Sequence, residues 1–279
     1  MLFRSHAAVQ ADGRSWPAVV TVDEEGGRVS RLRGLLGDLP SFATFGGSGD
    51  DAATQARFAR LGADLAGLGF TMDFAPVADV TIGAADPTIG DRSASGDPAV
   101  AARTVRAASA GQLQGGTVPV LKHFPGHGSV TSDSHQGLPV QPATQAQLDA
   151  RDLIPFRAAV AVGAPVVMIG HLDLVQFDPG VPSSLSPATY RLLRDSLAFD
   201  GVAVTDALEM GAVPSGGPGE EAVRALAAGA DLVLMPRDVA AASTGIVAAV
   251  QAGTLPVERL QEAATRVVAL QMWTAELRA

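Results

Sequence analysis

The stretch VPVLKHFPGHG, residues 118–128, shows the pattern that decides the fold class. Its first four residues are apolar and do not alternate with polar ones, which is typical of a strand buried on both faces. Lys122 and His123 follow at once. Six apolar runs of this kind occur along the chain, and most of them end in charged or imidazole side chains: 18–22, 71–77, 118–121, 165–169, 201–205 and 231–235.

Longer stretches rich in Ala, Leu and Arg separate these runs and predict helices at 51–68, 99–113, 144–162, 187–197, 219–228 and 239–251, with a closing amphipathic helix at 256–277. Strands that alternate with helices predict parallel βαβ units. A TIM-type (β/α)8 barrel needs about eight strands, and it carries its chemistry where the strands end. We therefore expect an α/β barrel that lacks one or two N-terminal strands, because only 17 residues precede Ala18.

An open doubly wound sheet would also place its site at the strand ends, but it normally has a Gly-rich phosphate loop after its first strand. The segment DEEGG at 23–27 is too acidic for that role. The barrel is preferred. The 279 residues show no linker and no shift in composition, so we predict one catalytic domain over residues 1–279.

The composition excludes several classes of function. The net charge is -9, which repels polyanions and argues against nucleic-acid binding. There are no cysteines, and therefore no disulfides, thiolate nucleophiles or Cys-ligated zinc. No signal peptide and no membrane span are visible in the sequence. We expect a cytoplasmic enzyme, although a truncated start would hide a lost signal.

Four of the five histidines lie in or beside predicted strand-end loops: His123, His127, His135 and His171. Imidazole can both give and take a proton near neutral pH. Asp133 is two residues from His135, so in an extended loop its carboxylate would orient and polarise the ring. A single histidine is more often structural, but this clustering favours chemistry.

Asp206 directly follows the predicted strand 201–205. A carboxylate at a barrel mouth can attack an anomeric carbon and form a glycosyl-enzyme. Taken alone, Asp206 is slightly better explained as the N-cap of the next helix than as a nucleophile.

The chain resembles the β-N-acetylglucosaminidases of glycoside hydrolase family 3, the NagZ type. The resemblance rests on the segments 23–29, 74–80, 91–93, 122–128, 133–135, 167–171 and 205–210, which occur in family order. The KHFPGHG segment followed by Asp133-Ser134-His135 is the most specific of these.

The resemblance implies a retaining hydrolase that releases terminal β-linked N-acetylglucosamine and needs no cofactor. Asp206 would be the nucleophile and His135, oriented by Asp133, the general acid and base. The sugar would be bound by Asp23, Arg31, Arg92, Lys122, His123 and His171. It also implies a role in recycling cell-wall muropeptides.

Two alternatives remain open. His123, His127, Asp133, His135 and His171 could ligate Zn²⁺ in a metal-dependent barrel hydrolase, although Pro125 and Gly126 disfavour a helix between the first two histidines. The chain could instead bind N-acetylglucosamine without turnover. Within the family, phosphorolysis could also replace hydrolysis.

An incomplete barrel would have two free edges. We therefore expect a gap between the 18–22 and 231–235 strands, filled poorly or by Leu2 and Phe3. Such a chain would be marginally stable as a monomer and would tend to self-associate through those edges.

Overall fold

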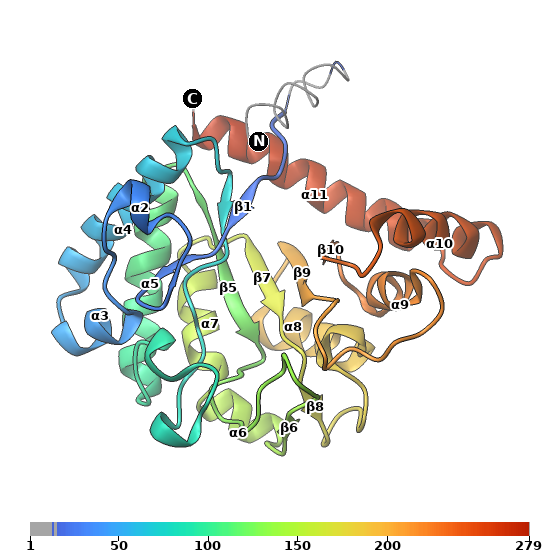
Figure 1. The fold of residues 1–279 in the computed structure, drawn as a ribbon, viewed down its shortest axis with the longest axis horizontal. Coiled ribbons are helices and arrows are strands. Elements are labelled where there is room, and N and C mark those ends of the chain that lie inside the picture. The colour runs from blue at the N-terminus through green and yellow to red at the C-terminus, as the bar shows by residue number, and fades with distance from the viewer. Residues whose placement is uncertain (1–12, 14–15, 279) are drawn as a thin grey trace.

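The computed structural model describes residue 13 and residues 16–278. Its centre is a curled, parallel, six-stranded sheet in the order β1-β4-β5-β7-β9-β10 (Figure 1). The strands are β1 (Thr21–Val22), β4 (Met72–Asp73), β5 (Val118–Phe124), β7 (Val166–Ile169), β9 (Val202–Ala207) and β10 (Leu232–Leu234). Each corresponds to one predicted run, and neighbours in the sequence are neighbours in the sheet. The α/β class and the parallel units are confirmed.

Helices separate successive strands and cover the outside of the sheet (Figure 1). They are α2 (Arg33–Leu36), α3 (Phe42–Ser48), α4 (Asp51–Gly67), α5 (Pro98–Gln114), α6 (Gln145–Ala150), α7 (Leu153–Val160), α8 (Pro187–Leu197), α9 (Glu220–Ala228), α10 (Val239–Gln251) and α11 (Val257–Leu277). The 3-10 turns are η1 (Gly83–Ala85), η2 (Gly90–Arg92) and η3 (Ser183–Leu185). Two small strand pairs lie outside this sheet: β2 (Glu24–Gly26) with β3 (Val29–Ser30), and β6 (Val140–Gln141) with β8 (Asp173–Leu174).

One predicted helix, 144–162, is two helices. A capping box between Thr144 and Gln147 starts α6, and the chain leaves helical geometry at Arg151, where φ is -138° and ψ is -74°. Pro155 then lies in the first turn of α7, where its missing N–H costs no hydrogen bond. The pattern of apolar residues continues across this break, which is why the sequence suggested one helix.

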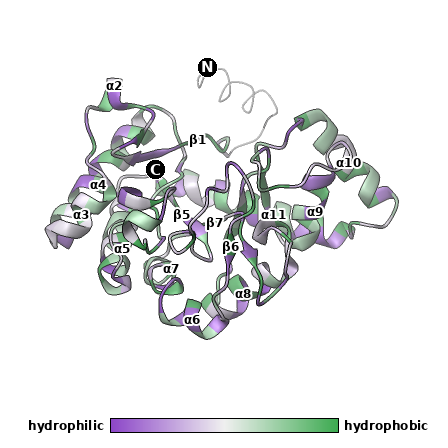
Figure 2. Ribbon diagram, turned by 60° about the horizontal axis from the view of Figure 1, so that its bottom comes forward, coloured by the Kyte–Doolittle hydropathy of each residue, from purple (hydrophilic) through white to green (hydrophobic). Residues whose placement is uncertain are grey.

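Alternation along the strands divides the apolar side chains into two layers. Val118, Val120, Val202 and Val204 pack together on the inner face of the curl. Their neighbours in the strands, such as Leu121, pack outward in the larger core between sheet and helices. Figure 2 shows that the outer helices carry both polar and apolar stretches. Because both faces are covered, the strands have the continuous apolar runs seen in the sequence.

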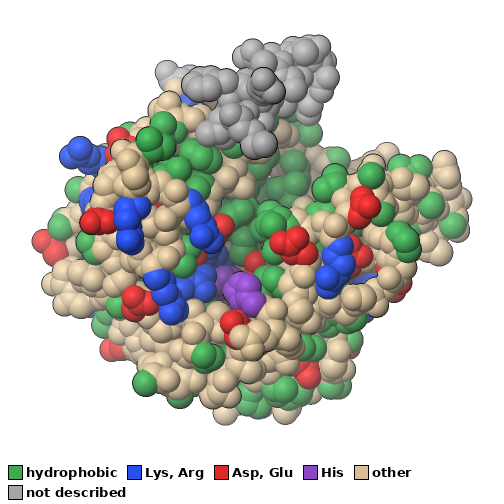
Figure 3. Space-filling model, in the orientation of Figure 1, with side chains coloured by type: hydrophobic (Ala, Val, Ile, Leu, Met, Phe, Trp, Pro, Cys, Tyr) green, Lys and Arg blue, Asp and Glu red, His purple; other side chains and the backbone are tan. Residues whose placement is uncertain are grey.

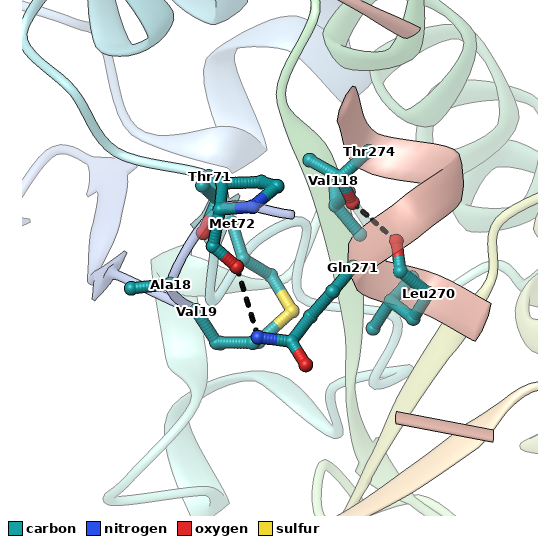
Figure 4. A pocket seen from close by; sticks show the side chains of 9 residues that line it. Ala18, Val19, Thr71, Met72, Val118, Leu270, Gln271 and Thr274 are labelled. Carbon is teal, nitrogen blue, oxygen red and sulfur yellow. Dashed lines mark hydrogen bonds between the residues drawn. The ribbon is translucent and has the colours of Figure 1, made fainter. Parts of the chain in front are cut away.

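Helix α11 covers the amino ends of the strands. Its Leu270 is buried with Met72, Val118 and Val202 on the inner face. The Gln271 Nε2 atom donates to the carbonyl of Pro17 at 2.9 Å, so the last helix is tied to the segment that precedes β1 (Figure 4). The carboxyl ends of the strands remain free for the site.

The sheet is open in the described part of the chain. Strands β1 and β10 stand at the two ends of its order and pair there with no further strand. The described residues therefore form a curled half-barrel, and its ends are the two strands between which we expected the gap. Leu2 and Phe3, which we expected to fill it, lie outside the described residues. No helix within residues 16–278 is both long enough and apolar enough to cross a membrane.

Candidate active site

The strand alternation that builds the inner core also directs polar side chains into a pocket. In β5, Val120 points to the inner face and Lys122, two residues on, lies on the same face beyond it. In β9, Val204 and Asp206 repeat this arrangement. Since side chains two apart in a strand share a face, Lys122 and Asp206 meet where the strands end.

These side chains line a pocket of about 370 Å³, within the roughly 300–1,000 Å³ of ligand sites. In the space-filling view it is a hollow with histidine at its centre and basic and acidic side chains around it (Figure 3). Seven predicted site residues line it: Asp23, Arg31, Arg92, Lys122, His123, His135 and Asp206.

Glu25 is the centre of a buried ion network on one side of the pocket. Its carboxylate accepts two hydrogen bonds from the Arg92 guanidinium, at 2.8 and 2.9 Å, and lies 2.6 Å from Lys122 Nζ. Lys122 Nζ also donates to Asp23 at 2.6 Å. Burial raises the pKa of Glu25, but the charges of Lys122 and Arg92 outweigh it and lower the pKa to about 2. The network stays charged and holds both cations in place.

Asp79 fixes the next histidine. Its Oδ2 lies 2.7 Å from His123 Nδ1, and its Oδ1 accepts the backbone N–H groups of His123 and His127 at 3.1 and 2.6 Å. A carboxylate can only accept, so Nδ1 of His123 carries a proton. The His123 Nε2 atom lies on the pocket side, 3.5 Å from Arg92.

Asp206 is half-buried at the end of β9, and its Oδ1 accepts the N–H of Ala207 at 2.8 Å. Burial by itself raises the pKa of Asp206, but the nearby rings of His123 and His171 more than offset it, so the pKa lies below its ordinary value of 3.8. The carboxylate is therefore anionic at neutral pH. No helix starts within a few residues of it, so it is not an N-cap.

His135 and Asp133 form a pair on the loop after β5. The Asp133 Oδ1 atom lies 2.7 Å from His135 Nδ1 and also accepts the His135 backbone N–H at 3.0 Å. The pairing predicted from their spacing is present. It leaves His135 Nε2 as the ring atom that is free to exchange a proton, and the ring is 62% exposed at the pocket.

His171 lies elsewhere than the resemblance implies. Its ring is buried and does not line the pocket; Nδ1 is 2.7 Å from Ser184 Oγ and Nε2 is 2.9 Å from the carbonyl of Ala207. With both nitrogens occupied, it supports the backbone next to Asp206.

The histidines and Asp133 do not converge on a metal site. Among residues 16–278, no group of three or more His, Cys, Asp or Glu side chains is placed to hold an ion. His123, His127 and Asp133 are each engaged by a separate partner: Asp79, Ser134 and His135.

Several pocket residues were missed from the sequence. Glu25 lies in the segment 23–29, which contributed to the exclusion of a phosphate loop and to the family resemblance, but Glu25 itself was given no role. Glu209, Met210 and Met235 also line the pocket. Glu209 and Met210 follow Asp206 in a quoted segment, but nothing in their pattern distinguishes a pocket wall from the start of a loop.

Comparisons with known proteins identify the family of the chain. Residues 1–270 match the glycosyl hydrolase family 3 N-terminal domain. The chain is 38% identical to the β-hexosaminidase LpqI of Mycobacterium tuberculosis, over 95% of this chain and 71% of that protein. It is 36% identical to a family 3 β-N-acetylglucosaminidase structure from Paenibacillus, with a TM-score of 0.92 over 99% of this chain and 53% of that one. A β-N-acetylhexosaminidase structure from Beutenbergia cavernae gives 35% identity and a TM-score of 0.88, over 97% of this chain and 83% of that one.

The predicted family is thus confirmed, and its N-terminal domain is of the TIM-barrel type, of which the described residues form the curled part. The chain belongs to glycoside hydrolase family 3 and is a glycosidase.

Proposed function

We propose that the chain is a retaining glycosidase that releases terminal β-linked N-acetylglucosamine. One observation carries this: an anionic Asp206 and the Asp133-oriented His135 line the same pocket, beside a cluster of hydrogen-bonding groups. The relatives named β-hexosaminidase and β-N-acetylglucosaminidase support the choice of sugar.

In the first step Asp206 attacks the anomeric carbon, and the bond to the leaving oxygen breaks as His135 Nε2 gives that oxygen a proton. In the second step His135 takes a proton from water, which displaces Asp206 and releases the sugar. The acid and base group is an imidazole and not a second carboxyl, so it does not raise the pKa of the nucleophile by repulsion between like charges. Asp133 stabilises the ring whenever it is charged.

The residues of the ion network bind the sugar. Asp23, Arg92, Lys122 and His123 present donors and acceptors that match sugar hydroxyls and the N-acetyl group, and Arg31 is exposed at the rim. We propose that residues 1–279 act as one catalytic domain. From the family resemblance we further propose a muropeptide substrate and a cytoplasmic location, which cell fractionation with a specific antibody would test.

The decisive assay uses p-nitrophenyl N-acetyl-β-glucosaminide beside the β-glucoside, with and without a chelator. We expect turnover of the first substrate only, unaffected by chelation. Loss of activity on chelation would favour the metal-dependent alternative, and binding of N-acetylglucosamine without turnover would favour a sugar-binding protein. Formation of the sugar 1-phosphate in phosphate buffer would reveal phosphorolysis.

A further inference from the structure

Ser134 lies between Asp133 and His135 in the sequence, but its side chain is buried while theirs are at least partly exposed. Within residues 131–136 it is the buried side chain, 2% exposed, while its neighbours are half-buried or exposed. A serine between two residues that serve the pocket faces the other way in an extended loop. It is therefore placed to attach the loop to the body of the protein.

Three hydrogen bonds make this attachment. Ser134 Oγ lies 2.9 Å from His127 Nε2. The carbonyls of Ser134 and His135 accept the N–H groups of Ala212 and Gly211 at 3.1 and 3.2 Å. A Cβ on Gly211 would lie only 2.7 Å from the His135 carbonyl, so this close approach requires glycine.

In the contact between His127 and Ser134, His127 is held in place by its burial and by its other partners. Its ring is 1% exposed and packs edge-on against His123, with 5.8 Å between the ring centroids. Its backbone N–H donates to Asp79 at 2.6 Å, the same carboxylate that orients His123. A single buried carboxylate thus fixes a histidine on the sugar side and a histidine on the loop side.

The protonation of His127 follows from its partners. Burial lowers its pKa, so the ring is neutral at physiological pH. Its Nδ1 is buried and has no hydrogen-bond partner in the described part of the chain. The tautomer that leaves no buried N–H unpaired has its proton on Nε2, which then donates to Ser134 Oγ.

We propose that His127 and Ser134 are positioning residues, whose hydrogen bond holds the Asp133–His135 loop where His135 can exchange a proton with the leaving group. This inference rests on the proposed function. Neither residue is among those that line the pocket, and both are buried, at 1% and 2% exposure. Since a shift of about 1 Å can cost roughly 100-fold in rate, breaking the contact should impair proton transfer more than binding.

The test compares kcat/KM for an activated substrate, 2,4-dinitrophenyl N-acetyl-β-glucosaminide, with that for the phenyl glycoside, whose leaving group needs a proton. Ser134→Ala and His127→Ala should each lower the phenyl value about 10- to 100-fold and the dinitrophenyl value less than about threefold. His127→Gln keeps an N–H donor and should recover part of the loss. The double variant should be no worse than either single one, because both remove the same contact.

Ser132→Ala is the matched control. Ser132 is exposed in the same loop, and its side chain makes no hydrogen bond within the described residues, so both substrates should be unaffected. Melting temperature and affinity for N-acetylglucosamine separate positioning from folding. If a residue matters only for stability, its replacement lowers the melting temperature without changing the ratio of the two kcat/KM values.

The proposal is overturned if Ser134→Ala and both His127 variants lower the two substrates equally, or lower neither. His135→Ala, measured alongside, distinguishes failure of the proposed function from failure of the positioning role. If His135→Ala shows no dependence on the leaving group, the proposed function fails and the positioning role fails with it; if it does and the Ser134 and His127 variants do not, only the positioning role is wrong.

Discussion

Replacing Glu25 with glutamine should destabilise the protein more than any comparable change at the pocket. The substitution keeps the size of the side chain and removes its charge. It leaves the Arg92 guanidinium without its carboxylate, and the 2% exposed Lys122 with only the partly exposed Asp23. The result is an uncompensated buried charge.

Two independent lines give the magnitude. Removing one member of a buried ion pair typically costs about 3–5 kcal/mol. The depression of the Glu25 pKa from 4.5 to about 2 gives a similar figure, about 3 kcal/mol at 1.36 kcal/mol per pH unit. We expect a loss of about 3 kcal/mol, which for a domain of this size lowers the melting temperature by roughly 6–12 °C.

Urea denaturation at neutral pH measures the loss, with Asp23→Asn as the matched control. Asp23 contacts the same ammonium at the same 2.6 Å, but its side chain is 39% exposed, so its loss should cost no more than about 1 kcal/mol. The sign of the pH dependence is also fixed. A depressed carboxyl pKa stabilises the native state above pH 4.5, and that stabilisation is lost as the pH falls towards 2. The difference between wild type and Glu25→Gln should therefore shrink by roughly 1 kcal/mol between about pH 7 and about pH 3.5.

Equal losses for Glu25→Gln and Asp23→Asn would refute this reasoning, because burial would then not control the strength of the network. A difference that grows as the pH falls would refute the assignment of the low pKa to Glu25.

Four further predictions concern the chemistry and the scaffold. Asp206→Asn should abolish nearly all turnover and spare sugar binding, and a slow 2-fluoro-sugar inactivator should label Asp206 in a peptide map; labelling elsewhere would contradict the nucleophile. His135→Ala should reduce hydrolysis of poor leaving groups by about 10²–10⁴-fold and activated aryl glycosides far less, with a weaker version in Asp133→Asn; a flat leaving-group series would be incompatible with an acid role. Burial raises the pKa of Asp152 from 3.8 to about 6, so its contribution to stability is present below pH 3.8 and is lost as the pH rises through about 6. The free energy of unfolding of Asp152→Asn, measured by urea titration, should therefore rise relative to that of wild type by up to about 3 kcal/mol between about pH 4 and about pH 7. If the free edges of β1 and β10 promote self-association, the sedimentation coefficient should rise with protein concentration, and a constant monomer value would count against it.

The strands were predictable from the sequence because each has a continuous apolar run that ends in a polar residue, as Val204 and Asp206 illustrate. The pairing of Asp133 with His135 was predictable because their spacing fixes their relative direction. Lys122 and Asp206 also reached the same pocket, since parallel strands end at one edge of the sheet.

Other features depend on contacts between distant segments and left no local signal. Glu25 acts through Lys122 and Arg92, which lie about 100 and 70 positions further along the chain. His171 also stands at a strand end, as the pocket residues do, but Ser184 and Ala207 occupy both of its nitrogens. The direction in which a side chain leaves a strand end is set by its tertiary partners.

The position of α11 has a consequence for synthesis of the chain on the ribosome. Every strand of the sheet is made before residues 257–277, yet Leu270 is what covers Met72 and Val118, and Gln271 reaches back to Pro17. The contact between Gln271 and Pro17 forms late, because two segments that are far apart in the sequence must come together before it can stabilise the fold. The nascent protein therefore carries an uncovered apolar face until its last helix has emerged, and a chaperone that recognises exposed valine and methionine would find it during that interval.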